Sequence, residues 1–354
     1  MNDLILLQNM SNRYGSDPAY VLAGGGNTSF KSDEILYIKG SGTSLSTIKA
    51  DDFVRMDRKK LAQMWDNKYP EDEAERERVV LSDMMDARVE GETRRPSVET
   101  LLHDIFPQKF ILHVHPSSIN GMTCGVKGKE ISKELFPDSV WVDACRPGYI
   151  LASLCREKLT SYKASKGKDA DLLFLQNHGV FFAGNTVEEI DALAFSVMKT
   201  LEDYIRAQKE EKVNAIAELA KSVTGYTFSD TVKGNGICSF DANRNSPTPD
   251  HIVYCKAKYF TCNLNVEKET LKEALESFNK ENGYYPRVII IKGVCALLLG
   301  DSEKMITTNV AILKDHVSVC KNAEAFGGYN GMTDDLVDFI VNWEVESYRA
   351  KVNA

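Results

Sequence analysis

The sequence lacks a long apolar run near its start, where residues 1–8 hold an acidic residue and only four consecutive apolar residues. A secretory signal needs an apolar stretch of about 7–15 residues, and a membrane-spanning helix needs about 20. An excess of basic residues is also missing, since the formal net charge is −8. We therefore expect a cytoplasmic protein whose partners are neither nucleic acids nor membranes.

The eight cysteines lack the regular spacing of a disulfide framework, and no Cys-x-x-Cys motif is present. Several cysteines, among them Cys295 and Cys320, lie within apolar runs. Cysteines in such positions are typical of reduced thiols in the core of a cytosolic protein. The sequence therefore predicts a fold that is held by packing and not by disulfide bonds.

Histidine is scarce, with six residues in the chain, yet three of the six lie at the ends of apolar stretches that read as strands. His113 and His115 close the stretch 109–115, and residues i and i+2 of a strand point to the same face. His178 follows a second such stretch. Three imidazoles and a carboxylate such as Glu99 form a ligand set for a divalent metal, zinc above all. Histidines with ordinary structural hydrogen bonds are the alternative.

Two glycine-rich segments, residues 23–29 and 40–43, flank a short predicted strand at 35–39. Glycine lets backbone N–H groups approach an anion closely, so the two segments together could hold one phosphate. No Gly-x-Gly-x-x-Gly sequence opens a helix here, and no Gly-Lys-Ser/Thr sequence closes a loop. These absences argue against a dinucleotide fingerprint and a Walker loop. The alternative is a pair of hairpin turns without a ligand.

Helical and strand patterns alternate along the chain and predict an α/β protein of more than one unit. We expect a catalytic domain at residues 1–221, whose last helix spans 186–211. Residues 222–249 are rich in Gly, Ser, Thr, Asn and Pro, which is typical of a linker or a crossing segment. A C-terminal α/β unit is expected at residues 250–354, where Trp343 lies on a helix that covers a surface.

The C-terminal unit repeats part of the first domain. If Gly184 is aligned with Gly300, two strand–turn–strand–helix patterns coincide, and Val294 takes the place of His178. We interpret this as a degenerate partial repeat that has lost its metal ligand. The alternative is that a common pattern has arisen twice.

Five motifs in this order resemble the class II (zinc-dependent) sugar-phosphate aldolase and adducin family over about residues 1–210. They are Gly-Gly-Asn-Thr-Ser (25–29), Lys-Gly-Ser-Gly (39–42), Pro-Ser-Val-Glu (96–99), His-Val-His (113–115) and Gln-Asn-His-Gly (176–179). Residues 248–256, 325–328 and 342–349 are similar to the aldolase half of bifunctional rhamnulose-1-phosphate aldolase/lactaldehyde dehydrogenase proteins. A short-chain dehydrogenase domain follows in those proteins, whereas this sequence ends at Ala354, so we expect no NAD chemistry.

The resemblance implies a central, mainly antiparallel sheet flanked by helices, followed here by the smaller C-terminal α/β unit. It also implies one Zn²⁺ per subunit at His113, His115 and His178, although cobalt or manganese could occupy the same ligands. Glu99 would ligate the metal at rest and act as the catalytic acid/base.

The resemblance implies further roles for a set of loop residues. The positions at which relatives hold the substrate phosphate are Gly26, Asn27, Thr28, Ser41, Gly42 and Ser97. Val98 departs from relatives, which have a second serine there, and this removes a possible hydroxyl donor. Relatives also use a tyrosine from a neighbouring subunit to protonate the leaving aldehyde. Tyr149 is a candidate for that role, and a shared site of this kind implies a homo-oligomer.

The implied activity is that of a lyase. It would cleave a ketose 1-phosphate, such as L-rhamnulose 1-phosphate, to dihydroxyacetone phosphate and an aldehyde through a metal-bound enediolate. A pentulose-phosphate 4-epimerase and a 3-oxo sugar-acid phosphate decarboxylase are alternatives on the same scaffold, since both use similar chemistry. A non-enzymatic, adducin-like interaction module typically lacks the full ligand set, which is complete here.

Overall fold

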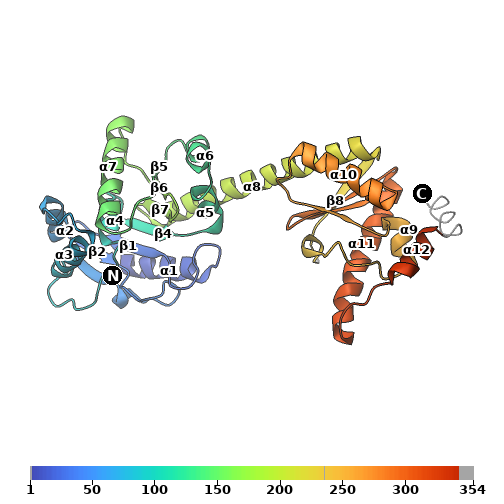
Figure 1. Cartoon of the computed structure of the whole chain (residues 1–354). Coiled ribbons are helices and arrows are strands. Elements are labelled where there is room, and N and C mark those ends of the chain that lie inside the picture. The colour runs from blue at the N-terminus through green and yellow to red at the C-terminus, as the bar shows by residue number, and fades with distance from the viewer. Residues whose placement is uncertain (1, 235, 343–354) are drawn as a thin grey trace. The chain divides into compact units, whose positions relative to one another are not determined.

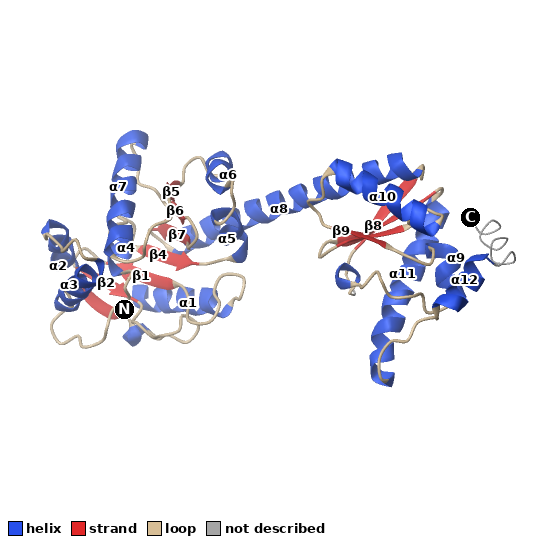
Figure 2. Cartoon of the chain, in the orientation of Figure 1, coloured by secondary structure: helices blue, strands red, loops and turns tan. Residues whose placement is uncertain are grey.

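The computed structural model describes residues 2–234 and 236–342 and divides the chain into two compact units, Met1–Tyr204 and Ile205–Ala354 (Figure 1). Each unit has its own sheet and its own apolar core. A large sheet in the first unit and a smaller one in the second, both with helices packed on them, confirm the expected α/β fold class (Figure 2).

The first unit is built on a seven-stranded sheet of order β3-β2-β1-β4-β7-β6-β5. Its strands are β1 (Asn27–Lys31), β2 (Ile35–Ile38), β3 (Val54–Asp57), β4 (Phe110–Val114), β5 (Val140–Val142), β6 (Leu172–Leu175) and β7 (Gly179–Gly184). Only the pair β5–β6 is parallel, and every other neighbouring pair is antiparallel. The expected mainly antiparallel sheet is therefore present.

Helices cover both faces of this sheet because successive strand side chains point to opposite sides. Ile111 lies in a core with α2, α3, α4 and α7, whereas its neighbour Leu112 lies in a core with α1, α5 and the first part of α8. The helices of this unit are α1 (Asn2–Ser16), α2 (Arg58–Gln63), α3 (Glu73–Asp86), α4 (Thr100–Asp104), α5 (Ser117–Thr123), α6 (Gly128–Leu135) and α7 (Tyr149–Lys166). The apolar faces of β4 are thus buried on both sides.

The long helix α8 (Val187–Thr224) belongs to both units. Ile190 and Ala194 are part of the first unit's core, and Ile216 and Ala220 are part of the second unit's core. The helix continues past the predicted end at residue 211, because the apolar side chains of Ile216 and Ala220 pack in the core of the second unit. No helix of the described residues combines the length and the apolar character that crossing a bilayer requires.

The second unit contains a four-stranded sheet of order β8-β11-β10-β9. The strands are β8 (Phe228–Val232), β9 (Phe260–Cys262), β10 (Val288–Ile291) and β11 (Cys295–Gly300), and the helices are α9 (Pro249–Cys255), α10 (Lys268–Asn282), α11 (Glu303–Ala323) and α12 (Asp334–Asn342). The segment 222–249, expected as a linker or crossing segment, holds the end of α8 and the strand β8, which pairs with β11. β8 is an edge strand, which tolerates polar residues because one of its sides is open to solvent, and this accounts for Ser229, Asp230 and Thr231. Trp343 lies outside the described residues.

Candidate metal centre

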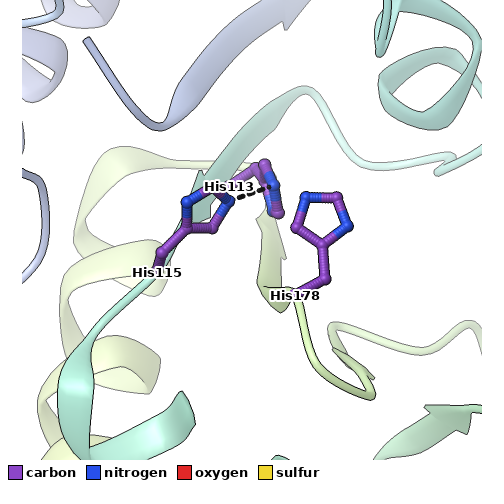
Figure 3. A group of neighbouring side chains, drawn as sticks. All are labelled: His113, His115 and His178. Carbon is purple, nitrogen blue, oxygen red and sulfur yellow. Dashed lines mark hydrogen bonds between the residues drawn. The ribbon is translucent and has the colours of Figure 1, made fainter. Parts of the chain in front are cut away.

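Three histidines converge at one end of the first sheet (Figure 3). His113 is on β4, His115 follows this strand, and His178 is in the turn between β6 and β7. One ring nitrogen from each lies within 4.8 Å of the other two. The alternation of side chains on β4 aims two of the rings at one point, and the β6–β7 turn supplies the third. The structure therefore brings together the three predicted ligands.

The hydrogen bonds of His113 leave one of its nitrogens free for a cation. Nδ1 lies 2.9 Å from the carbonyl of Val180, which can only accept, so Nδ1 carries the proton. Nε2 then presents a lone pair, and it lies 2.9 Å from Nε2 of His115 and 3.2 Å from Oε1 of Glu99. This donor set fits a divalent metal, because lone pairs and a carboxylate face one another around one point.

Burial lowers the pKa of His115 to about 4, with a further contribution from the neighbouring imidazoles of His113 and His178. His115 is therefore neutral near pH 7, which is the form that ligates a metal.

Glu99 lies between the histidines and the glycine-rich segments. Its Oε1 is 3.2 Å from Nε2 of His113 and 3.4 Å from Nε2 of His178. Asn27 Nδ2 donates to its Oε2 at 2.9 Å. Burial raises the pKa of Glu99, but the neighbouring imidazoles of His113 and His178 and the hydrogen bond from Asn27 outweigh it and hold the pKa well below its usual range. Glu99 is thus a carboxylate at rest.

The segment before α4 is a turn that is not helical. The helix starts at Thr100, and Glu99 is the N-cap residue, with φ −92° and ψ 10°. The hydroxyl of Ser97 accepts from the N–H of Glu99 at 3.2 Å, two residues away, and so does not cap a helix that begins at 97. The same hydroxyl is hydrogen-bonded to Asn27 Nδ2. The non-helical turn therefore aims Ser97 and Glu99 at the same asparagine.

The glycine-rich segments meet this turn. Gly40 forms an isolated bridge with Pro96, and the N–H of Ser41 donates to the carbonyl of Arg95 at 2.9 Å. Gly26 has φ +75°, and a Cβ there would lie 3.2 Å from the carbonyl of His113, so this position requires glycine. The loops at 24–28, 40–42 and 95–99 thus form one neighbourhood.

Thr28 and Asn27, two of the expected loop residues, differ in their hydrogen bonds. Thr28 is 0% exposed, and its hydroxyl forms a hydrogen bond with the hydroxyl of Ser11 on α1 at 2.7 Å. This hydroxyl therefore faces away from Glu99. Asn27 Oδ1, in contrast, is buried without a hydrogen-bond partner among the described residues. Such an acceptor has room for a hydroxyl of a ligand.

Tyr149 begins α7 and lies in an aromatic cluster. Its ring centroid is 5.7 Å from that of Trp65 and 4.6 Å from that of Tyr69. None of its contacts within the described part of the chain is with a histidine of the centre. The structure therefore does not bring this candidate proton donor to the metal ligands within one chain.

Lys39 lies near Glu99 and has no role assigned from the sequence. It directly follows β2, is 7% exposed, and its Nζ has one acceptor, the carbonyl of Gly24 at 3.4 Å. No carboxylate of the described residues lies within ion-pair distance. Burial lowers its pKa, and the charge of Glu99 opposes this. The Lys-Gly-Ser-Gly motif contains this lysine and could have marked it as a candidate, but the motif does not reveal that the side chain is buried.

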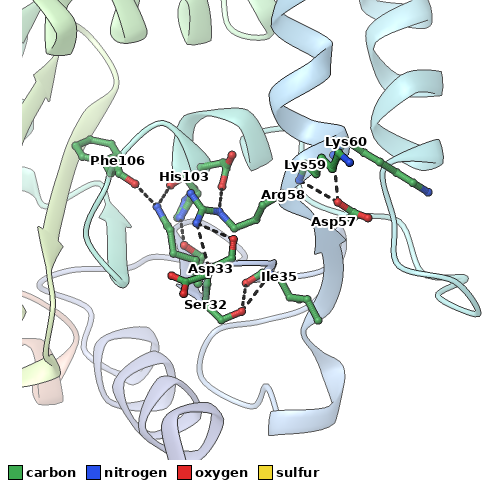
Figure 4. A network of polar contacts seen from close by, with 12 residues as sticks. Ser32, Asp33, Ile35, Asp57, Arg58, Lys59, Lys60, His103 and Phe106 are labelled. Carbon is green, nitrogen blue, oxygen red and sulfur yellow. Dashed lines mark hydrogen bonds and ion pairs between the residues drawn. The ribbon is translucent and has the colours of Figure 1, made fainter.

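A second buried lysine, Lys31, has two close acceptors, and Figure 4 labels the two residues that provide them, His103 and Phe106. Nζ of Lys31 donates to the carbonyls of His103 and Phe106 at 2.6 and 2.5 Å. Beside it, Arg58 Nε lies 2.6 Å from Asp104 Oδ1. These contacts attach the end of α4 to β1 and to the start of α2, and so hold the helix that Glu99 caps. His103, which we interpret as structural, is 0% exposed.

Comparison with known proteins gives a match to the class II aldolase and adducin N-terminal domain over residues 9–208. A curated relative, the uncharacterized oxidoreductase YuxG of Bacillus subtilis (strain 168), is 24% identical over 405 aligned residues, 96% of this chain and 57% of the relative. The chain thus spans little more than half the length of that relative.

Two solved structures are similar to the first unit. The N-terminal class II aldolase domain of a conserved protein from Thermoplasma acidophilum is 26% identical, with a TM-score of 0.50, and covers 57% of this chain and 93% of that chain. A sugar-phosphate aldolase from Thermotoga maritima is 16% identical, with a TM-score of 0.42, and covers 59% and 96% respectively.

Proposed function

The chain belongs to the class II aldolase and adducin family, and from this premise we propose that it is a metal-dependent lyase that cleaves a ketose 1-phosphate to dihydroxyacetone phosphate and an aldehyde. L-Rhamnulose 1-phosphate is the substrate that we propose first. The observation that supports this most strongly is the convergence of three imidazoles beside the carboxylate of Glu99, which contacts His113 and His178 and accepts from Asn27 at 2.9 Å.

In our proposal His113, His115 and His178 hold one Zn²⁺. When bound, the metal supplies Lewis-acid stabilisation of the negative charge that develops on the substrate oxygens. The protein orients the ligands, since the carbonyl of Val180 fixes the tautomer of His113. Three protein ligands leave coordination positions for the substrate.

Glu99 is the proposed acid/base at carbon 3 of the substrate. Cleavage breaks the C3–C4 bond, the C4 hydroxyl loses its proton as it becomes the aldehyde, and C3 gains a proton. In the reverse, addition direction, the Glu99 carboxylate takes that C3 proton, and its low pKa keeps it ready to do so. The group that serves the C4 oxygen is proposed to come from a second copy of the chain in a homo-oligomer.

The loops beside Glu99 are the proposed phosphate site. Ser41, Gly42 and Ser97 supply hydroxyl and backbone donors, and Lys39 supplies a buried ammonium whose one acceptor among the described residues is the carbonyl of Gly24 at 3.4 Å. A phosphate there would give Lys39 the anionic partner that the protein does not provide. We assign no side-chain role to Thr28, because its hydroxyl is bonded to Ser11.

Release of dihydroxyacetone phosphate from a panel of ketose 1-phosphates, with and without a chelator, tests the proposal. We expect release that stops when the chelator removes the metal and that returns when zinc is restored. No release from any member of the panel, with zinc shown to be bound, would contradict the aldolase assignment. Formation of a C4 epimer or of carbon dioxide from the corresponding substrates would then identify the alternatives.

A further inference from the structure

A cavity of about 360 Å³ lies between α3, the start of α7 and the segment 95–101. Its floor is apolar and closed, since Val80, Met84, Leu101 and Ala152 are each at most 3% exposed. Val98 lies at its rim and is 60% exposed. Small-molecule sites are commonly about 300–1,000 Å³ with mostly apolar walls, so this cavity has the size and the lining of a ligand site.

Two arginines give this cavity an excess of positive charge. Arg78 and Arg95 both line it, both are exposed, and neither has a carboxylate within ion-pair distance among the described residues. The one acidic residue of the lining, Glu77, already accepts from the backbone N–H of Tyr149 at 3.2 Å and lies 3.5 Å from Arg76. The unpaired guanidinium groups therefore favour an anion, while the floor favours an apolar body.

The cavity is separate from the histidine centre although the two share a segment of chain. None of the three histidines lines it, nor do Glu99 and Asn27. The backbone from 97 to 99 divides the two places, because Ser97 and Glu99 face Asn27 whereas Val98 faces the cavity. A ligand in the cavity would touch Val98 and Leu101, which precede and follow Glu99 in the chain, without occupying the substrate's position.

We propose that this cavity is a second ligand site, for a small organic anion with an apolar body. The anionic group lies between Arg78 and Arg95, and the apolar body packs on Leu101 and Ala152. This inference does not depend on the proposed reaction, since none of the proposed metal ligands and none of the residues proposed to hold the phosphate lines the cavity.

Calorimetric titration of the full chain with sodium 4-phenylbutyrate, and with 4-phenyl-1-butanol as the uncharged analogue, tests the proposal. We expect one saturable site for the acid and at least about tenfold weaker binding of the alcohol, the scale of a lost charged hydrogen bond. Equal affinity for the two compounds would overturn the assignment of an anion site.

Variants locate the binding. Arg95→Gln and Arg78→Gln should each lower the affinity for 4-phenylbutyrate. Arg146→Gln is the matched control and should leave this affinity unchanged, because Arg146 is an exposed arginine that is paired with Glu73 outside the cavity. Ala152→Leu narrows the floor, and Val98→Trp blocks the rim should the floor variant fold poorly. Unchanged binding in both, or displacement of the acid by inorganic phosphate, would place the ligand elsewhere and contradict the proposal.

Discussion

The first unit contains the strand order β4-β7-β6-β5 within its larger sheet, and the second unit is built on the order β8-β11-β10-β9. In both sets the first two neighbouring pairs are antiparallel and the last is parallel. A helix lies between the two parallel strands in each set, and another follows the antiparallel hairpin. The two units therefore share a four-stranded arrangement with the same connections.

The resemblance extends to the hairpin turns. Asn177 and Gly293 have positive φ values of 59° and 71°, and each is the middle residue of its turn. The next residue closes the turn onto the preceding strand, through the N–H of His178 at 3.2 Å and the N–H of Val294 at 3.0 Å. These matching details support our proposal that the second unit is a degenerate partial repeat.

The two units differ where the metal centre lies. His113 is opposite Phe181 on β7, and Thr231 is opposite Leu297 at the corresponding place on β11. Val294 stands in place of the turn histidine. The turn and the sheet thus form without imidazoles, so the histidines of the first unit are not needed for this fold. Among its described residues the second unit also has no strands in the positions of β1 to β3; in the first unit Asn27 begins β1 and Lys39 directly follows β2.

The largest effect is expected when His178 of the first unit is replaced by valine, the residue at the corresponding turn position of the second unit. His178→Val should lose the metal and the activity while the fold survives, because Val294 occupies the same turn in the other unit. Mutation of a residue that only hydrogen-bonds to a metal ligand lowers metal affinity by about 10- to 100-fold, so the loss of a ligand itself should lower the affinity further. Metal content, turnover and far-ultraviolet circular dichroism check this. Retention of zinc with full activity would break the comparison.

Glu99→Gln should keep the metal but slow turnover by about a hundredfold or more, the usual scale for a lost acid/base. The reason is that three imidazoles remain as ligands, while the amide cannot take the proton. Metal content and kcat, measured on the same preparation, separate the two properties. A rate near that of the wild type would remove Glu99 from the mechanism.

Lys39→Met should weaken the affinity for inorganic phosphate by about tenfold, because it removes one charged hydrogen bond. It should leave the free energy of unfolding unchanged or raise it, since a buried and poorly partnered charge is costly. Lys31→Met is the matched control. It removes two hydrogen bonds to carbonyls and should lower stability without a change in phosphate affinity. If both variants bind phosphate equally well, Lys39 is not part of the phosphate site.

The pH dependence of the first unit's stability should carry the signature of Lys31. Burial lowers its pKa to about 7 from 10.5. Between these values the unfolded chain binds the proton that the folded chain has lost, so this lysine makes the free energy of unfolding rise with pH. The slope should approach 1.4 kcal/mol per pH unit at most. Urea unfolding at pH 7.0 to 8.5 should show a smaller slope for Lys31→Met, and equal slopes would contradict the assignment.

The smallest effect is expected in the turn of the second unit. Gly293→Ala should destabilise this unit by about 1 kcal/mol, because alanine is strained at positive φ. The corresponding change in the first unit, Asn177→Gly, should be neutral or slightly stabilising, since it relieves the same strain. Thermal unfolding of both variants tests whether the two turns are equivalent. A stabilising Gly293→Ala would break the equivalence.

The sequence predicted those parts of the fold that local pattern determines. The stretch at 109–115 is apolar and ends in His-x-His, and the structure places the strand at Phe110–Val114. The hairpin around Asn177 and the repeat anchored at Gly184 and Gly300 could be recognised for the same reason. Both glycines close strands of the same length and position.

Other features depend on contacts that a sequence does not display. Ser229 and Asp230 gave β8 the composition of a linker, because an edge strand with one solvated side needs few apolar residues. The start of α4 at Thr100 depends on the bond between Ser97 and Asn27, which are far apart in the chain. Lys39 became a candidate only when its burial and its one weak acceptor were known.

The number of divalent metal ions per full-length chain tests the central claim most directly, that one unit carries the metal centre and the other only its scaffold. Titration of the metal-free protein with zinc, followed by elemental analysis, should give one tightly bound ion per chain, and His178→Val should give none. Two equivalent ions, or one that survives this substitution, would contradict the account.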